Sequence, residues 1–247
     1  MLRDEYDVLV TFAVHIRPVT CRSSRELRNA PTGHETLKNE AVTSYGWETS
    51  ERPESSGYIA PAVLELLGRV GARRVLDLGC GNGDLCGQLA KAGHDVVGVE
   101  VDSEGVRIAR QTHPRIPFYN FGVDADPLAV LHQEGERHFD AVVSTEVIEH
   151  LYAPHLLPAY ARGLLVKGGH LILSTPYHGY LKNLLLSLFD HWDTHHTPLW
   201  HGGHIKFWSV ATLSRLLEEN HFQVTGFRGV GRVPYLWKSM VLMARAT

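Results

Sequence analysis

The chain has 247 residues, of which 44% are hydrophobic and 21% are charged, and its formal net charge at pH 7 is -3. This length allows one well-packed α/β domain plus an arm and excludes two full domains, while the charge offers no general attraction for nucleic acid. The chain has 3 cysteines but no C-x-x-C pair, which argues against a disulfide framework or a zinc cluster and indicates a reducing compartment. We therefore expect a cytoplasmic protein without a nucleic-acid partner, and no apolar run is long enough to predict a membrane span.

Residues 1–55 combine Arg, Glu, Ser, Thr and Pro without sustained periodicity, so they predict a partly flexible N-terminal arm before a domain at 56–247. Tyr45 and Trp47 lie near the end of this arm. Two interpretations remain open for them: a segment that folds over a ligand, or aromatic anchors that attach the arm to the surface. A helix is predicted over 61–70, with its leading proline in the first turn, where a missing amide hydrogen is tolerated.

The stretch Val75–Glu100 predicts a strand, a glycine-rich turn, a helix and a second strand, which together form a βαβ unit. Its glycines at 79, 81 and 83 let the backbone turn sharply and approach a ligand closely. Glu100 follows the second strand, where a carboxylate can accept hydrogen bonds from both hydroxyls of a ribose. The unit therefore predicts a nucleoside site.

Asp84 helps to decide which nucleoside this is. A dinucleotide fingerprint, G-x-G-x-x-G, would have its third glycine here, and a carboxylate at that position would repel a pyrophosphate. S-adenosyl-L-methionine has a sulfonium and no phosphate, so nearby acids suit it. The segment Asp77–Gly83, DLGCGNG, resembles the first motif of class I S-adenosylmethionine-dependent methyltransferases. A purely structural glycine turn and an NAD site are the alternatives.

The resemblance implies S-adenosyl-L-methionine as the cofactor, together with a set of binding residues. Asp124 would face the adenine amino group and Ala125 would offer its backbone, whereas a loop acid that caps the next helix is the alternative for Asp124. The complete predicted cofactor set is Asp77, Gly79, Gly81, Asn82, Gly83, Glu100, Val101, Asp124, Ala125 and Thr145.

Strands and helices continue to alternate after Glu100. Helices are predicted at 103–112 and 210–220, and strands at 117–121, 138–144, 168–174, 223–227 and 240–244. This pattern predicts an α/β fold with a Rossmann-like, doubly wound, seven-stranded sheet and a ligand at the carboxyl ends of its strands. The last two strands have only a loop between them, so the mostly parallel sheet should contain one antiparallel strand near the C-terminus, as the resembled family has it.

Glu146, Glu149 and His150 follow the predicted strand 138–144 at spacing i, i+3 and i+4. If they open a helix, all three face one way, above the methyl end of the cofactor. Together with the later His204, they resemble the E-x-x-E-H and H-x-K-F motifs of the O-methyltransferases of ubiquinone biosynthesis and of small-RNA 2′-O-methyltransferases. The resemblance implies that all four bind a divalent metal, for which Mg, Mn, Fe, Co and Zn remain open. The alternative is a helix-capping core histidine at 150 and a solvated histidine loop.

Residues 176–209 are predicted to form a helical, histidine-rich lid insertion. Its histidines are His178, His191, His195, His196, His201 and His204. Within it, Tyr180–Trp192 carries apolar residues at helical spacing. In the ubiquinone enzymes the matching place is apolar and meets a lipid substrate at a membrane surface, so the resemblance implies an acceptor lid with peripheral membrane contact. Packing of this helix on the sheet is the alternative.

Taken together, these features predict an S-adenosylmethionine-dependent O-methyltransferase that acts on a hydroxyl of a small or lipid-like acceptor, either a catechol or a vicinal diol. Divalent-metal assistance is expected, and His150 and His204 are the predicted catalytic residues. One alternative is a metal-independent enzyme in which His150 or a neighbouring histidine is the general base. RNA 2′-O-methylation and a non-catalytic nucleoside-binding role are further alternatives, the former disfavoured because the chain shows no basic groove.

Overall fold

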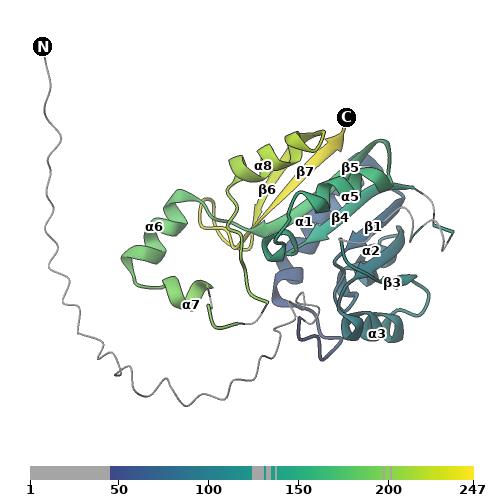
Figure 1. Ribbon diagram of the computed structural model, residues 1–247, viewed down its shortest axis with the longest axis horizontal. Helices are drawn as coiled ribbons and strands as arrows, with labels where there is room; N and C mark the ends of the chain where they lie inside the picture. The colour runs from purple at the N-terminus through teal and green to yellow at the C-terminus, as the bar shows by residue number, and fades with distance from the viewer. Residues whose placement is uncertain (1–44, 124–130, 132–134, 137, 197, 201) are drawn as a thin grey trace, which may run out of the picture. The chain divides into compact units, whose positions relative to one another are not determined.

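The computed structural model describes residues 45–123, 131, 135–136, 138–196, 198–200 and 202–247 (Figure 1). All of them belong to one compact unit, Glu40–Thr247. Because this unit begins before residue 56, the described end of the predicted arm, residues 45–53, is part of the domain.

A seven-stranded sheet with the order β3-β2-β1-β4-β5-β7-β6 forms the centre of the unit. Its strands are β1 (Arg74–Leu78), β2 (Asp95–Glu100), β3 (Phe118–Asn120), β4 (Phe139–Thr145), β5 (Leu165–Pro176), β6 (Phe222–Val230) and β7 (Ser239–Ala246). Neighbouring strands are parallel except for β7, which is antiparallel to both β5 and β6. The predicted Rossmann-like sheet with one antiparallel strand near the C-terminus is therefore confirmed.

Helices cover both faces of this sheet, as Figure 1 shows. The helices on the sheet are α1 (Glu54–Val70), α2 (Asp84–Lys91), α3 (Ser103–Thr112), the single-turn η2 (Ile148–His150), α5 (Leu156–Leu164) and α8 (Val210–Glu219). In contrast, α6 (Tyr180–Leu188) and α7 (Trp192–His196) extend away from the sheet. Successive residues of β1 point to opposite faces, so Val75 packs with the α1 residue Leu66 while Leu76 belongs to the cluster of Leu157 and Leu213. The central strands are apolar on both faces because both faces are covered.

Helix α1 begins seven residues before Pro61, at Glu54, so the prediction that this proline occupies the first turn is wrong. The earlier start buries Ile59 and Ala60 in the cluster that also contains Val63. Since Pro61 itself is exposed, its ring does not disturb the core. The free energy gained by burying these apolar side chains exceeds the cost of the one helical hydrogen bond that proline, which has no amide hydrogen, cannot donate.

The position of the site follows from the strand order. From β1 the chain proceeds to β2 and β3 on one side, and then returns to β4 on the other side of β1. In such sheets, ligands bind beyond the carboxyl ends of the strands next to this reversal. These ends are Leu78, Glu100 and Thr145, which is where the predicted cofactor residues cluster in the sequence.

Candidate active site

The turn after β1 has the backbone that its glycines predict. Gly79, Gly81 and Gly83 all have positive φ, at 82°, 55° and 81°. The amide of Gly79 donates to the carbonyl of Val99 in β2 over 2.8 Å. A Cβ at Gly81 would lie 2.3 Å from the ring of Trp47, so both conformation and space require glycine there.

Two buried carboxylates, Asp77 and Glu100, lie beside this turn. Glu100 accepts hydrogen bonds from the amides of Gly81 and Asp102, each over 2.8 Å. Because a carboxylate oxygen has two lone pairs, both oxygens can still accept a ribose hydroxyl. Asp77 accepts only from the Cys86 thiol, over 3.2 Å, and its Oδ1 is buried without a partner among the described residues. Burial raises the pKa of Asp77 to about 7 and also raises that of Glu100.

The segment before α1 closes one side of this region. Its Tyr45 amide donates to Oδ2 of Asp102 over 2.7 Å. The side-chain amide of Asn82 donates to the carbonyls of Thr49 and Glu51, over 3.0 and 2.8 Å. Asn82, a predicted cofactor residue, therefore also fixes the segment that folds over the turn.

A cavity of about 880 Å³ opens at the carboxyl ends of β1, β2 and β4, a volume typical of small-molecule sites. The predicted residues Asp77, Gly79, Gly81, Asn82, Glu100, Val101 and Thr145 line it, whereas Gly83, the N-cap of α2, does not. Asp124 and Ala125 lie outside the described residues. Tyr45 and Trp47 also line the cavity, which favours the first of their two interpretations.

Several lining residues were not predicted from the sequence, among them Ser56, Phe121, Val123, Tyr152 and Trp200. Phe121 and Val123 follow β3, so their position after a predicted strand could have indicated that they line the site. Tyr152 and Trp200 belong to loops with no regular spacing, and only the fold brings them to the cavity.

The turn after β4 differs from the prediction. Glu146 has a φ of 54°, and Ile148–His150 forms one 3-10 turn, so no α-helix places Glu146, Glu149 and His150 on one face. The Glu146 carboxylate instead accepts hydrogen bonds from the hydroxyls of Ser174 and Ser239, over 2.9 and 3.2 Å. The left-handed backbone at Glu146 interrupts the helix that the predicted spacing requires, and Glu146 is not part of the group of converging ligand atoms.

Glu149, His150 and His204 do converge, with their ligand atoms within 4.8 Å of one another. Glu149 is fully buried, and its Oε2 accepts from the hydroxyl of Thr175 over 3.0 Å. Its Oε1 has no hydrogen-bond partner among the described residues and lies 3.9 Å from Nε2 of His204. This buried carboxylate oxygen is an unsatisfied group beside His150 and His204, which line the cavity, whereas Glu149 itself does not line it.

Backbone contacts hold His204 beside Glu149 and orient His150. The amides of Ile205 and Lys206 both donate to the Glu149 carbonyl, over 2.9 and 3.0 Å. Nδ1 of His150 lies 2.6 Å from the carbonyl oxygen of Gly202, so this nitrogen carries the proton and donates it. Nε2 is therefore the nitrogen that can take up a proton or coordinate a metal.

Burial sets the charge state of this cluster. It raises the pKa of Glu149 well above its usual range, and the nearby Glu146 carboxylate raises it further. Burial lowers the pKa of His204 to about 4 and also lowers that of His150. Both imidazoles are therefore neutral at pH 7, which is the state that a base or a metal ligand requires.

The insertion between β5 and α8 contains two short helices, α6 and α7. Large apolar side chains of α6 and the residue after it are exposed: Tyr180 by 84%, Leu188 by 69% and Phe189 by 63%. The buried residue of α6 is Lys182, so the alternative in which this helix packs its apolar stripe on the sheet is wrong. Among the described residues, no helix combines the length and apolar character needed to cross a membrane.

Comparisons with known proteins agree with this geometry. A family described as methyltransferase domain matches residues 50–226. A ubiquinone biosynthesis O-methyltransferase of Alkalilimnicola ehrlichii is 29% identical over 150 residues, which are 58% of this chain and 59% of that protein. Its counterpart from Acinetobacter baylyi is 29% identical over 145 residues, or 57% of this chain and 61% of that protein. The chain thus matches less than two thirds of the length of these relatives.

Solved structures share the fold. Magnesium protoporphyrin IX methyltransferase from Synechocystis, with bound S-adenosylhomocysteine, has a TM-score of 0.58 and 19% identity, covering 76% of this chain and 82% of that one. A Burkholderia thailandensis 1,6-didemethyltoxoflavin-N1-methyltransferase, with its substrate and S-adenosylhomocysteine, has a TM-score of 0.54 and 21% identity, covering 76% and 77%.

Proposed function

The chain belongs to the methyltransferase domain family, and from this premise we propose that it is an S-adenosylmethionine-dependent enzyme that methylates a hydroxyl of a small or lipid-like acceptor. The acceptor is a catechol or a vicinal diol. The observation that carries the proposal is the single cavity shared by the glycine turn, Glu100 and the pair His150 and His204. A methyl donor and a group that prepares an acceptor hydroxyl can therefore meet in one place.

The donor end of the cavity suits this cofactor. Glu100 would accept the ribose hydroxyls, and the three glycines would admit the amino acid portion close to the backbone. Asp77 would pair with a cationic part of the cofactor, which compensates the cost of its buried, unpaired oxygen. This cofactor has no phosphate, so the carboxylate of Asp84 at the start of α2, which would repel a pyrophosphate, does not oppose its binding.

The transfer itself needs alignment and removal of one proton. The acceptor oxygen forms a bond to the methyl carbon while the carbon–sulfur bond breaks, so the sulfonium becomes a neutral thioether. The hydroxyl proton must leave the acceptor. Without a bound metal, Nε2 of His150 would accept it, since the ring is neutral and its Nδ1 donates to Gly202; with a metal on Nε2, this nitrogen could not act as the base. Burial of Glu149 and the aromatic lining restrict water around the reacting atoms.

A divalent cation fits the same cluster. Glu149, His150 and His204 would hold it, because they offer an unpaired buried carboxylate oxygen and two neutral imidazoles. Such an ion would lower the pKa of an acceptor hydroxyl and orient it. Glu146, the fourth predicted ligand, is instead engaged by Ser174 and Ser239.

We also propose that a lipid-like acceptor reaches the cavity past the insertion, and that the protein contacts a membrane surface peripherally there. The exposed apolar side chains of Tyr180, Leu188 and Phe189 support this proposal. Replacing Leu188 and Phe189 by Ser should reduce co-sedimentation with phospholipid vesicles. The matched control is Val166→Ser, at an exposed position of β5, and equal sedimentation of all three proteins would contradict the proposal.

The function is tested with methyl-labelled S-adenosylmethionine and a panel of acceptors. The panel contains a simple catechol, an alkyl catechol, a vicinal diol and an RNA with a free 3′ end. We expect label on one hydroxyl of a catechol or diol, and we expect Glu149→Gln to lose this transfer while Glu104→Gln, an exposed acid on α3, keeps it. Label on nitrogen, on carbon or only on the RNA would overturn the proposal.

A further inference from the structure

A second, smaller cavity of about 240 Å³ adjoins the first. Glu146, His196 and His204 line both, so the two cavities meet at the imidazole cluster. The cationic side chains around the second cavity are Lys182, Arg232 and Lys238, and Glu146 is the carboxylate among its lining residues. The cavity therefore has an excess of positive charge.

Lys182 is the main feature of this second cavity. It is only 5% exposed, and the contact of its ammonium is a long hydrogen bond of 3.4 Å to the carbonyl of Lys238. Within the described part of the chain, no carboxylate lies within ion-pair distance of it. The Glu146 oxygens accept hydrogen bonds from Ser174 and Ser239 instead. The Glu146 carboxylate favours the charged ammonium without forming an ion pair with it. An ammonium buried without an ion-pair partner is costly, so this position suits a negatively charged ligand.

The surrounding groups also favour an anion. Nε2 of His196 is buried and has no hydrogen-bond partner among the described residues. The ring of His178 stacks on that of His196 with centroids 5.6 Å apart. Arg232 makes no ion pair with a described residue, whereas Lys238 pairs with Glu54. Lys182 keeps its proton at neutral pH, since burial lowers its pKa only to about 8.

We propose that the second cavity binds an anionic group of the methyl acceptor, a carboxylate or a phosphate, with Lys182 as its principal contact. This inference rests on the proposed function, because it places the anion on the same molecule that presents its hydroxyl to Glu149, His150 and His204. His204 lines both cavities, so one compact acceptor reaches both. The acceptor is thereby an acidic catechol or diol, and the anion fixes which hydroxyl faces the methyl group.

The test measures binding apart from turnover. The full chain, saturated with S-adenosylhomocysteine, is titrated calorimetrically with 3,4-dihydroxybenzoate, 3,4-dihydroxyphenylphosphonate, the neutral 3,4-dihydroxybenzamide and inorganic phosphate. We expect one or both anionic catechols to bind at least about 10-fold more tightly than the amide, as one charge-assisted contact provides. Tighter binding of the benzoate would indicate that the cavity prefers a carboxylate, and tighter binding of the phosphonate would indicate a phosphate.

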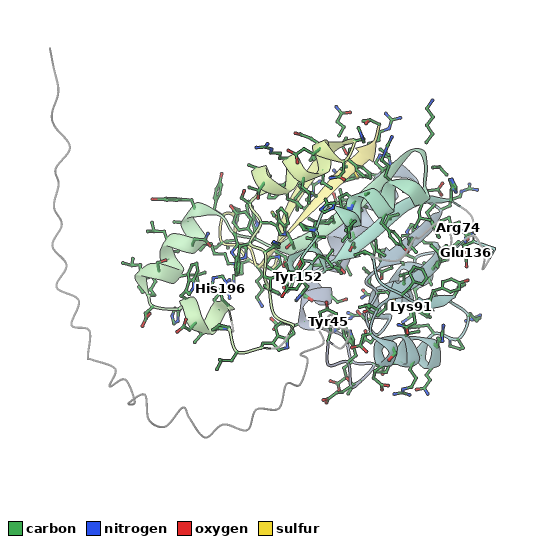
Figure 2. All side chains as sticks on the ribbon, in the orientation of Figure 1. Tyr45, Arg74, Lys91, Glu136, Tyr152 and His196 are labelled. Atoms are coloured by element: carbon green, nitrogen blue, oxygen red, sulfur yellow. The ribbon has the colours of Figure 1, made fainter. Side chains whose placement is uncertain are left out.

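Variants of Lys182 test whether the second cavity causes the preference for anionic catechols over the amide. Lys182→Met should abolish it and Lys182→Arg should restore most of it, while both should bind S-adenosylhomocysteine as the wild type does, which shows that they fold. Lys91→Met is the matched control, since Lys91 is exposed on α2 and lies far from His196 in Figure 2. A preference that survives in Lys182→Met, or equal binding of the amide by the wild type, would overturn the inference.

Two further outcomes separate this inference from the proposed function. Lys182-dependent binding of inorganic phosphate, without binding of either anionic catechol, would show that the cavity holds a free anion and would contradict the inference. Lys182-dependent binding of an anionic catechol, with no methyl transfer to any catechol or diol, would support the anion site and refute the proposed function.

Discussion

The two halves of the main cavity are built in different ways. The cofactor half, comprising the turn 79–83, Asp77 and Glu100, belongs to the central strands, and its backbone is fixed by hydrogen bonds to β2. The acceptor half, comprising Glu149, His150 and loop 202–206, depends on one 3-10 turn and on contacts to a peripheral insertion. In the proposed function, donor recognition therefore belongs to the core, whereas acceptor recognition lies in segments that can change without loss of the fold.

Gly81→Val should break the cofactor half with the largest effect. Positive φ and the Trp47 ring both oppose a side chain here, and their combined cost predicts at least about 100-fold weaker binding of S-adenosylmethionine. Calorimetric titration measures this. Gly68→Val on α1, where a Cβ meets nothing within 4 Å, is the control and should bind as the wild type does. Equal affinities of the two variants would contradict the assigned cofactor site.

Glu100→Gln should weaken the same ligand by about 10- to 100-fold, since hydrogen bonds to a charged group contribute about 1.5–3 kcal/mol. The glutamine side chain also has only one oxygen, so it cannot use two oxygens to accept hydrogen bonds from the amides of Gly81 and Asp102 as Glu100 does. The control is Glu104→Gln, an exposed acid in the first turn of α3. If the dissociation constant of Glu100→Gln is that of the control, the ribose contact must lie elsewhere.

Asp77 makes the stability of the cofactor half depend on pH. Its pKa in the folded state, about 7, is raised by burial above the usual value, so the folded chain binds the extra proton and stability is lost as pH rises from about 4 to about 7. Asp77→Asn removes this loss. Relative to wild type, its free energy of unfolding should therefore rise between pH 5 and 7, by about 1–3 kcal/mol. Urea unfolding of the ligand-free protein measures it, and parallel pH profiles would contradict the burial of a charged group.

His178, which lines the second cavity next to the acceptor half, should show a pH dependence of the opposite sign. Burial and the nearby Lys182 together lower its pKa to about 4, so its contribution to stability is complete above the unfolded pKa of 6.5 and is lost as pH falls toward 4. The free energy of unfolding of His178→Gln, minus that of the wild type, should therefore be more positive at pH 5 than at pH 7. The same urea series measures both variants. A shift in the same direction as Asp77→Asn would show that the two halves do not differ in this way.

The smallest effect concerns the exposed face of the insertion. Leu188→Ser should change the free energy of unfolding by less than about 0.5 kcal/mol, because this side chain is 69% exposed. Leu66→Ala in α1, fully buried, should cost about 2–5 kcal/mol. Similar losses in the two variants would indicate that the insertion packs more tightly than its exposure implies.

Sequence reasoning succeeded where local pattern and fold agree. The apolar strands predicted the sheet, because burial on both faces leaves a continuous apolar signal. The glycine motif predicted a turn with positive φ beside the cavity. Sequence reasoning failed where the backbone conformation of a single residue determines which side chains meet. The spacing of Glu146, Glu149 and His150 fits a helix, yet the left-handed Glu146 ends that pattern. The stripe on α6 likewise gave no sign of whether another element covers it, since exposure depends on tertiary contacts.

The role of Lys182 shows the same limit. In the sequence it marks the polar side of an amphipathic helix, where lysine is ordinarily solvated. In the structure Lys182 is buried and lines the second cavity, while the apolar residues Tyr180 and Leu188 are exposed, so these residues have the opposite of the expected exposure. Only the fold shows that its ammonium is buried near Glu146 and His196.

In the proposed function, the acceptor half prepares a hydroxyl while the cofactor half binds the donor independently. The most direct test removes divalent metal with a chelator and measures both S-adenosylhomocysteine binding and methyl transfer to the acceptor found in the labelled panel. We predict unchanged binding, loss of transfer and recovery when a divalent cation is restored. Full transfer by the metal-free enzyme would contradict a metal at Glu149, His150 and His204, and would leave His150 as the base.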